Sequence, residues 1–141
     1  MYYIETEASF DAAHFLAGYD GKCANIHGHR WRVVLAVRGE ELEADGPKRG
    51  MLKDFGDVKK ELKAEADALD HSLLIERGSL RQKTMEALQE EGFRVLEFDF
   101  RPTAEEFARY FYERMKARGY ETDSVRVYET PNNLAVYREI E

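Results

Sequence analysis

The sequence predicts an α+β fold in which an antiparallel sheet carries helices inserted after its second strand. Two stretches near the N-terminus alternate apolar and polar residues with a period of two, and two stretches near the C-terminus are rich in β-branched and aromatic residues. Between these pairs, apolar residues recur at helical spacing. With 141 residues, 43% of them hydrophobic, and no internal repeat, the chain is expected to form one domain over residues 1–141.

The first strand is predicted over residues 2–12. Ile4, Phe10 and other apolar side chains in it share one face, while acidic residues mostly take the other, which is typical of a half-buried strand. His14 continues the apolar face, so we expect its imidazole to point inward.

The second strand is predicted over residues 30–38, with Trp31 and Val33 on its apolar side. Counting back by twos, His29 and His27 fall on the same side as Trp31 if the strand extends that far. In that case both imidazoles point in one direction from an extended segment.

The middle of the chain is predicted to be mostly helical. A charged loop with several glycines over residues 39–50 precedes an amphipathic helix over residues 57–69. A short helix over residues 79–91 and an extended piece over residues 94–98 follow. The apolar stripe of the first helix consists of Val58, Leu62, Ala66 and Leu69.

A third helix is expected to begin after Thr103, which has the position of an N-cap with Glu106 three residues later, as in a capping box. The last two strands are predicted over residues 124–129 and 134–138. The segment 131–133, Pro-Asn-Asn, suits a hairpin connection between them.

Composition excludes several classes of function. With 28 acidic and 21 basic side chains the net charge is −7, which disfavours binding to nucleic acid or to an anionic membrane. The longest apolar run, Val33–Val37, is far shorter than the roughly 20 residues of a membrane-spanning helix. The first residues lack the features of a secretory signal, so a cytoplasmic location is expected.

The sharpest local feature is the segment from Cys23 to His29. His27 and His29, two residues apart on an extended segment, can bind one metal ion, and His14 can supply a third imidazole. Three imidazoles with an open fourth position are typical of a catalytic zinc site. The alternative is that the histidines are ordinary polar residues of the core or of turns.

Several other residues are candidates for a catalytic or binding role, and each also has a purely structural interpretation. Cys23 is the only cysteine, hence a packing atom, a metal ligand or a reactive thiol. Asp70 can orient His71 as a general acid or base, although adjacent residues of an extended chain point apart, and a helix-terminal histidine is equally expected. Glu129 can accept two hydrogen bonds from a planar ligand or be simply solvated, and the helix cap already explains Thr103.

Six motifs follow one another along almost the whole chain: Phe10-Asp11-Ala12-Ala13-His14, Cys23 to His29 with Trp31 and Val33, Gly50-Met51-Leu52-Lys53-Asp54-Phe55, Leu69-Asp70-His71, Pro102-Thr103-Ala104-Glu105, and Val127-Tyr128-Glu129-Thr130-Pro131. In this order they resemble the family of 6-pyruvoyltetrahydropterin and 6-carboxytetrahydropterin synthases. The resemblance implies the tunnelling fold, in which each subunit supplies a four-stranded antiparallel sheet with a helical layer. It also implies a homo-oligomer, often a hexamer built from trimers, with active sites at subunit interfaces.

Carried over residue by residue, the resemblance assigns roles to nine positions. It implies a zinc ion held by three histidines, a catalytic thiol, a proton-transfer pair and a set of pterin contacts. Ala104 stands where the family usually has serine or threonine, so one hydroxyl contact is missing. The implied zinc ligands are His14, His27 and His29, and the implied thiol is that of Cys23. The implied proton-transfer pair is Asp70 with His71, and the implied pterin contacts are Glu129, Thr103 and Glu105.

Three residues separate Cys23 from His27, which is similar to the bacterial 6-carboxy enzymes. The implied reaction is the zinc-dependent conversion of 7,8-dihydroneopterin triphosphate to 6-carboxy-5,6,7,8-tetrahydropterin, with release of acetaldehyde and triphosphate, in queuosine and 7-deazapurine biosynthesis. Binding of the triphosphate requires a local basic patch in a net acidic chain. Candidates for it are Lys22, Arg30, Arg32, Lys53 and Arg101.

Two alternatives stay open. The segment around Glu129, followed by Asn132 and Asn133, is similar to the pyruvoyl branch, which eliminates triphosphate without cleaving the side chain. The second alternative is a non-catalytic protein, a zinc-stabilised oligomer that binds a pterin without converting it. Such a protein would tolerate loss of Cys23 and His71, whereas an enzyme would not.

Overall fold

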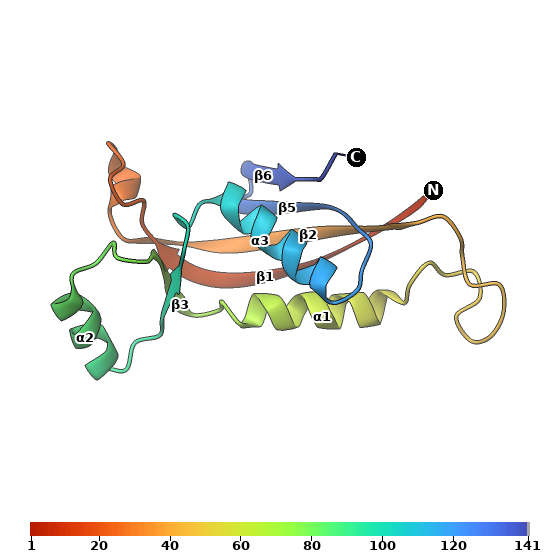
Figure 1. Cartoon of the computed structure of the whole chain (residues 1–141), viewed down its shortest axis with the longest axis horizontal. Coiled ribbons are helices and arrows are strands. Elements are labelled where there is room, and N and C mark those ends of the chain that lie inside the picture. Colours follow the sequence, from red (N-terminus) through yellow and green to blue (C-terminus); the bar gives the residue numbers. More distant parts are fainter. Residues whose placement is uncertain (141) are drawn as a thin grey trace.

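The computed structural model describes residues 1–140, which form a six-stranded sheet in the order β4-β3-β1-β2-β5-β6 with three α-helices (Figure 1). The α+β class predicted from the sequence agrees with this arrangement. The elements are β1 (Tyr2–His14), the 3-10 turn η1 (Lys22–Ala24), β2 (His27–Gly39), α1 (Phe55–Asp67), β3 (Ser72–Glu76), α2 (Gln82–Glu90), β4 (Val95–Phe98), α3 (Ala104–Ala117), β5 (Thr122–Thr130) and β6 (Asn133–Tyr137).

The four predicted main strands are present as β1, β2, β5 and β6, each antiparallel to its neighbour. The sheet is nevertheless larger than predicted, because β3 and β4 extend it beyond β1 in parallel orientation. The extended piece expected at residues 94–98 is β4, whereas β3 was not predicted. The sheet is therefore mixed, with an antiparallel part that carries most of the pairing.

The hairpin of β1 and β2 is longer than the predicted ranges 2–12 and 30–38. Its register pairs His14 with His27 and Ala12 with His29. The expectation that the second strand extends back to His27 is confirmed. Both strands thus reach the end of the sheet at which their histidines lie.

The helices α1 and α3 begin at side-chain caps, whereas α2 has none. Asp54 accepts a hydrogen bond from the N–H of Gly56 at 2.7 Å, so α1 begins two residues before the predicted range 57–69. Thr103 caps α3 as predicted, accepting from the N–H of Glu106 at 3.2 Å, while its own N–H donates to the Arg101 carbonyl. The predicted helix 79–91 is shorter, as α2. None of the helices described over residues 1–140 is long and apolar enough to cross a membrane.

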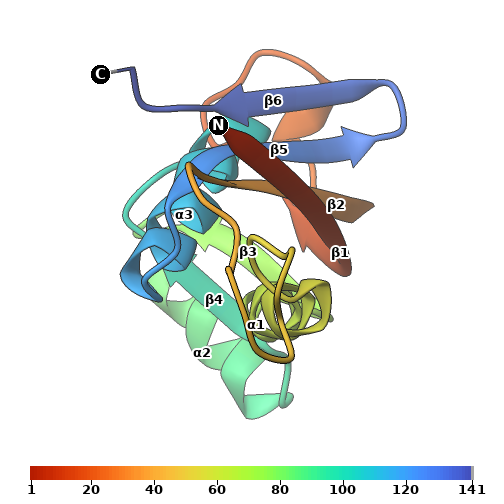
Figure 2. The ribbon, with the colours of Figure 1, turned by 90° about the vertical axis from the view of Figure 1, so that its right-hand side faces the viewer.

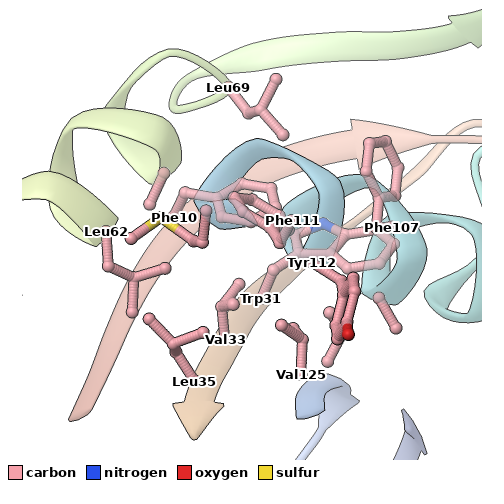
Figure 3. Close-up of a cluster of buried hydrophobic side chains, with 14 of the residues drawn as sticks. Phe10, Trp31, Val33, Leu35, Leu62, Leu69, Phe107, Phe111, Tyr112 and Val125 are labelled. Carbon is pink, nitrogen blue, oxygen red and sulfur yellow. The ribbon is translucent and has the colours of Figure 1, made fainter. Parts of the chain in front are cut away.

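The core lies between the sheet and the pair α1 and α3, which cover the same face of β1, β2 and β5 (Figures 1 and 2). Trp31, Phe107 and Phe111 are fully buried, and the Phe10 ring stacks on Trp31 with centroids 5.8 Å apart (Figure 3). Burial of each such ring stabilises the fold by about 1.5–3 kcal/mol. The aromatic core reaches as far as the histidines at the end of the hairpin.

Candidate active site

Three histidines converge at one end of the sheet. His14 ends β1, and His27 and His29 begin β2, so the hairpin register brings them together. A nitrogen atom of each imidazole lies within 4.8 Å of one from each of the others, and the ring centroids are 4.6–5.1 Å apart. This cluster can hold a metal ion, and it consists of the three residues singled out in the sequence.

Hydrogen bonds fix the imidazole tautomers. A backbone carbonyl can only accept, so Nδ1–H of His14 donates to the Pro102 carbonyl at 2.7 Å, and Nδ1–H of His27 donates to the Asn25 carbonyl at 2.7 Å. The opposite nitrogen, Nε2, of His14 and that of His29 are buried without a hydrogen-bond partner. Buried polar atoms rarely stay unpaired, so a cation bound between these two nitrogen atoms would satisfy both.

Burial also keeps His14 and His29 in the form that binds metal. Desolvation lowers the pKa of His14 to about 4, despite its bond to the Pro102 carbonyl, and desolvation also lowers the pKa of His29. Neutral imidazole is the form that coordinates a metal. Trp31 donates a hydrogen bond from Nε1 to the Ala12 carbonyl. Its ring packs edge-to-face against the imidazoles of His14 and His29 and excludes water from their inner side.

Asp70 and His71 form a hydrogen-bonded pair just beyond α1. His71 Nδ1 lies 2.8 Å from Asp70 Oδ2, and the backbone N–H of Asp11 donates to the other carboxylate oxygen at 2.8 Å. These bonds, that from Asp11 first, lower the pKa of Asp70. The expectation that adjacent side chains point apart is wrong here, because His71 has φ = 54°, in the left-handed region rather than an extended conformation.

Two carboxylates lie beside the histidine cluster. Burial first, and the nearby negative charge of Glu105 second, raise the pKa of Glu129, while His27 acts in the opposite direction. Glu129 lies near the end of β5, and Glu105 lies in the first turn of α3. The Thr103 hydroxyl accepts the capping hydrogen bond of α3, as the interpretation of this residue as a helix cap predicted. The structure thus brings Glu105 and Glu129 together with His27.

Cys23 lies apart from the imidazole cluster. It occupies η1, its side chain is half-buried, and its carbonyl accepts from the N–H of Leu16 at 2.8 Å. Among residues 1–140, the imidazole cluster contains the three histidines and does not include the Cys23 sulfur. Of the three roles open from the sequence, the metal ligand is therefore not supported, and packing atom and reactive thiol remain.

A depression of about 680 Å³ connects the two histidine groups, since both His29 and His71 line it. Its lining is mostly apolar, and six of its 14 residues come from the segment 72–101. The run Leu73-Leu74-Ile75 is the signal that could have indicated a strand there. The lining includes Ile26 and Arg30 from the first part of the chain and Leu88, Phe93, Arg94 and Val95 from this segment.

Comparison with known proteins agrees with this geometry. The family model described as 6-pyruvoyl tetrahydropterin synthase matches residues 3–140. A protein of Haemophilus influenzae named 6-carboxy-5,6,7,8-tetrahydropterin synthase is 36% identical over 142 residues, covering 99% of this chain and 100% of the relative. A Synechocystis protein of the same name is 34% identical over 125 residues, covering 82% of this chain and 97% of the relative.

Solved structures agree as well. The 6-pyruvoyl tetrahydropterin synthase of Caenorhabditis elegans has a TM-score of 0.68 and 27% identity, covering 99% of this chain and 96% of the other. An uncharacterized protein of Wolinella succinogenes has a TM-score of 0.80 at 20% identity, covering 99% and 98%, which speaks for the fold alone. The tunnelling fold expected from the motifs is confirmed. The chain therefore belongs to the 6-pyruvoyl tetrahydropterin synthase family, and its role is that of a pterin synthase.

Proposed function

We propose that the protein is a zinc-dependent 6-carboxy-5,6,7,8-tetrahydropterin synthase, a lyase of queuosine and 7-deazapurine biosynthesis. Its substrate is 7,8-dihydroneopterin triphosphate. The observation that carries the proposal is the cluster of three imidazoles beside two carboxylates, in which the Nε2 atoms of His14 and His29 are buried without a hydrogen-bond partner. The name of the Haemophilus influenzae relative, which matches over its whole length, supports the 6-carboxy product.

His14, His27 and His29 would hold the zinc ion. A bound Zn²⁺ would supply Lewis acidity, which makes hydroxyl groups of the substrate side chain more acidic. Trp31 and the Pro102 carbonyl keep the imidazoles oriented and shielded from water. The protein thereby supplies a preorganised electrophilic site at the end of the sheet.

Cys23 and His71 move the protons. In the proposed mechanism the Cys23 thiolate removes a carbon-bound proton from the substrate side chain. His71 delivers protons from Nε2, because its Nδ1 is held by Asp70. The anionic Asp70, stabilised by the backbone N–H of Asp11, fixes this orientation.

Glu129 and Glu105 recognise the pterin. Their carboxylates accept hydrogen bonds from the N–H groups along the amino-pyrimidine edge of the ring. Burial and the nearby Glu105 raise the pKa of Glu129, and the N–H donors of a bound pterin would offset both effects on its carboxylate. Arg30, which lines the depression and is 74% exposed, is the basic candidate best placed to meet the triphosphate.

The reaction balances with one water molecule. The carbon of the side chain next to the ring becomes the carboxyl group, and the outer two carbons leave as acetaldehyde. The triphosphate leaves from the outermost carbon, and the electrons released at the carboxyl carbon reduce the dihydropterin ring and the outer fragment. No external oxidant or reductant is required.

Product analysis tests the proposal. The zinc-loaded protein is incubated with 7,8-dihydroneopterin triphosphate, the pterin is identified by mass spectrometry, and acetaldehyde is assayed in parallel. We expect equimolar acetaldehyde and 6-carboxytetrahydropterin. The Cys23→Ala and His71→Ala variants should retain zinc and lose turnover, whereas unchanged turnover in both would contradict the catalytic roles.

The second candidate is a 6-pyruvoyl tetrahydropterin synthase, favoured by the 27% identity to the Caenorhabditis elegans enzyme. Triphosphate release with a pyruvoyl product and no acetaldehyde would assign the protein to that branch. Unchanged substrate, together with tight binding of the pterin, would instead support the non-catalytic pterin-binding oligomer.

We further propose that the protein acts as a homo-oligomer in the cytoplasm, with a hexamer as the expected size. Ile26 and Phe93 line the depression and are 62% and 61% exposed, which is unusual for large apolar side chains at a site unless another surface covers them. The solution mass at micromolar concentration tests this. A monomer with full activity would overturn it.

A further inference from the structure

The turn that carries Asp70 and His71 is held in a costly backbone conformation. A non-glycine residue with φ = 54° costs on the order of 1 kcal/mol and persists only where its surroundings determine it. The backbone of Asp11 provides one anchor, since its N–H donates to Asp70 Oδ1 at 2.8 Å and its carbonyl accepts the N–H of His71 at 2.6 Å. This anchor fixes the side of the turn that faces β1.

The other side of the turn is held by side chains. The carbonyl groups that follow α1 have no helical partner, and α1 has no basic residue in its last turn to compensate them. The Ser72 hydroxyl donates to the Leu69 carbonyl at 2.5 Å. The Arg94 guanidinium donates to the carbonyl of Asp70 at 2.7 Å and to that of Ala68.

Arg94 reaches the turn from an adjacent part of the sheet. Its own carbonyl accepts the N–H of Leu73 at 2.9 Å, which places it at the start of the pairing between β3 and β4. A guanidinium presents several N–H donors in a rigid plane and can therefore bridge two carbonyl groups at once. It also supplies a positive charge to the C-terminal end of the α1 dipole.

We propose that Arg94 is a positioning residue for the proton-transfer step, acting through the turn rather than on the substrate. By bridging the carbonyls of Ala68 and Asp70, it holds the left-handed conformation of His71 and the hydrogen bond between Asp70 and the imidazole. This inference rests on the proposed function for its catalytic consequence. The structural part, the hold of Arg94 on the turn, stands independently of any substrate.

The experiment compares Arg94→Gln and Arg94→Lys with a matched control, Arg77→Gln. Arg77 is an exposed arginine at the end of β3 that pairs with Glu97 and Asp99 and does not touch the turn. Zinc content is measured first, followed by kcat and KM, and by hydrogen–deuterium exchange of the peptide over residues 68–72. Each variant is assayed as the full zinc-loaded chain.

In Arg94→Gln we expect kcat to fall by about 10- to 100-fold, because a shift of about 1 Å in a reacting group costs up to about 100-fold. Zinc content should be unchanged, since the imidazole cluster is untouched. KM should stay within about twofold, because the guanidinium of Arg94, although this residue lines the depression, is engaged with the carbonyls of Ala68 and Asp70. Exchange in the 68–72 peptide should accelerate at least about tenfold. Arg94→Lys, which keeps the charge but not the planar bridge, should recover part of kcat, and Arg77→Gln should resemble the unmodified protein.

Unchanged exchange in the turn would overturn the inference whatever the activity. Accelerated exchange with unchanged kcat would also overturn it, because the turn would then be held by Arg94 without consequence for proton transfer. If the unmodified protein converts no pterin, the proposed function fails, and exchange alone decides whether Arg94 holds the turn. If Arg94→Gln does not fold, the Lys variant decides by the same two measurements.

Discussion

Glu65 joins α1 to α3, and its replacement by glutamine tests how a buried carboxylate stabilises this fold. Its side chain is 4% exposed and accepts from Arg114 Nε at 2.8 Å, from Arg114 Nη2 at 3.3 Å and from Arg118 Nε at 2.9 Å. Burial alone would raise the pKa of Glu65, but the two guanidinium groups outweigh it and hold the pKa below its ordinary value.

The expected loss in Glu65→Gln is about 2–3 kcal/mol in the free energy of unfolding at pH 7. Hydrogen bonds to charged groups each contribute about 1.5–3 kcal/mol, and the amide keeps one acceptor but turns an N–H₂ donor toward a guanidinium. The loss stays below the 3–5 kcal/mol of a fully buried broken pair, because the side chains of Arg114 and Arg118 are 51% and 31% exposed and can be rehydrated.

The effect should depend on pH in one direction. A carboxyl group with a lowered pKa in the folded state binds fewer protons there than in the unfolded state, so its stabilisation is present above the unfolded pKa of about 4.3 and is lost as the pH falls below it. The difference between Glu65→Gln and the unmodified protein should therefore be largest at neutral pH and shrink toward pH 3. Metal-free protein is used, so that changes in the histidines cancel in the comparison.

Urea unfolding followed by circular dichroism, at equal protomer concentration, measures these differences. Glu113→Gln is the control, because Glu113 is 66% exposed and lies 4.0 Å from Arg109, a surface pair expected to contribute less than about 0.5 kcal/mol. A loss in Glu65→Gln no larger than in the control, or one that is the same at pH 7 and pH 3, would refute the reasoning.

Three further outcomes are expected. His29→Ala should bind less than about a tenth of the zinc retained by Cys23→Ala when both are analysed for metal, because only the first removes an atom of the imidazole cluster. His71→Gly should be more stable to heat than His71→Ala by about 1 kcal/mol, with turnover lost in both, since glycine adopts φ = 54° without strain. Phe107→Ala, at a fully buried ring against Trp31, should lower the free energy of unfolding by about 3–5 kcal/mol in the same urea assay.

The cluster of three histidines was predictable from local periodicity. His14 lies on the apolar face of a strict alternation, and His27 and His29 are two residues apart on the strand that pairs with it. Their meeting required only that the hairpin be in register, which a buried face enforces. The cap of α3 at Thr103 was equally predictable, because it depends on residues three positions apart.

What was missed depends on contacts between distant parts of the chain. β3 pairs with β1 in parallel through only three residues, and a short apolar run does not distinguish a strand from a buried helix. The conformation of His71 depends on Asp11 and Arg94, and no local signal marks a histidine for positive φ. The burial of Glu65 could have been predicted, since this residue lies in the same helical stripe as Leu62 and Leu69.

The two histidine groups are held by opposite means, and this difference bears on their chemistry. The imidazole cluster lies on two long paired strands against Trp31, so its geometry is as rigid as the core. His71, at 79% side-chain exposure, is held by hydrogen bonds alone on a strained turn. A metal site needs fixed ligand positions, whereas a group that exchanges protons needs access to solvent and substrate together with a fixed orientation. The depression between them is where a substrate would meet both requirements at once.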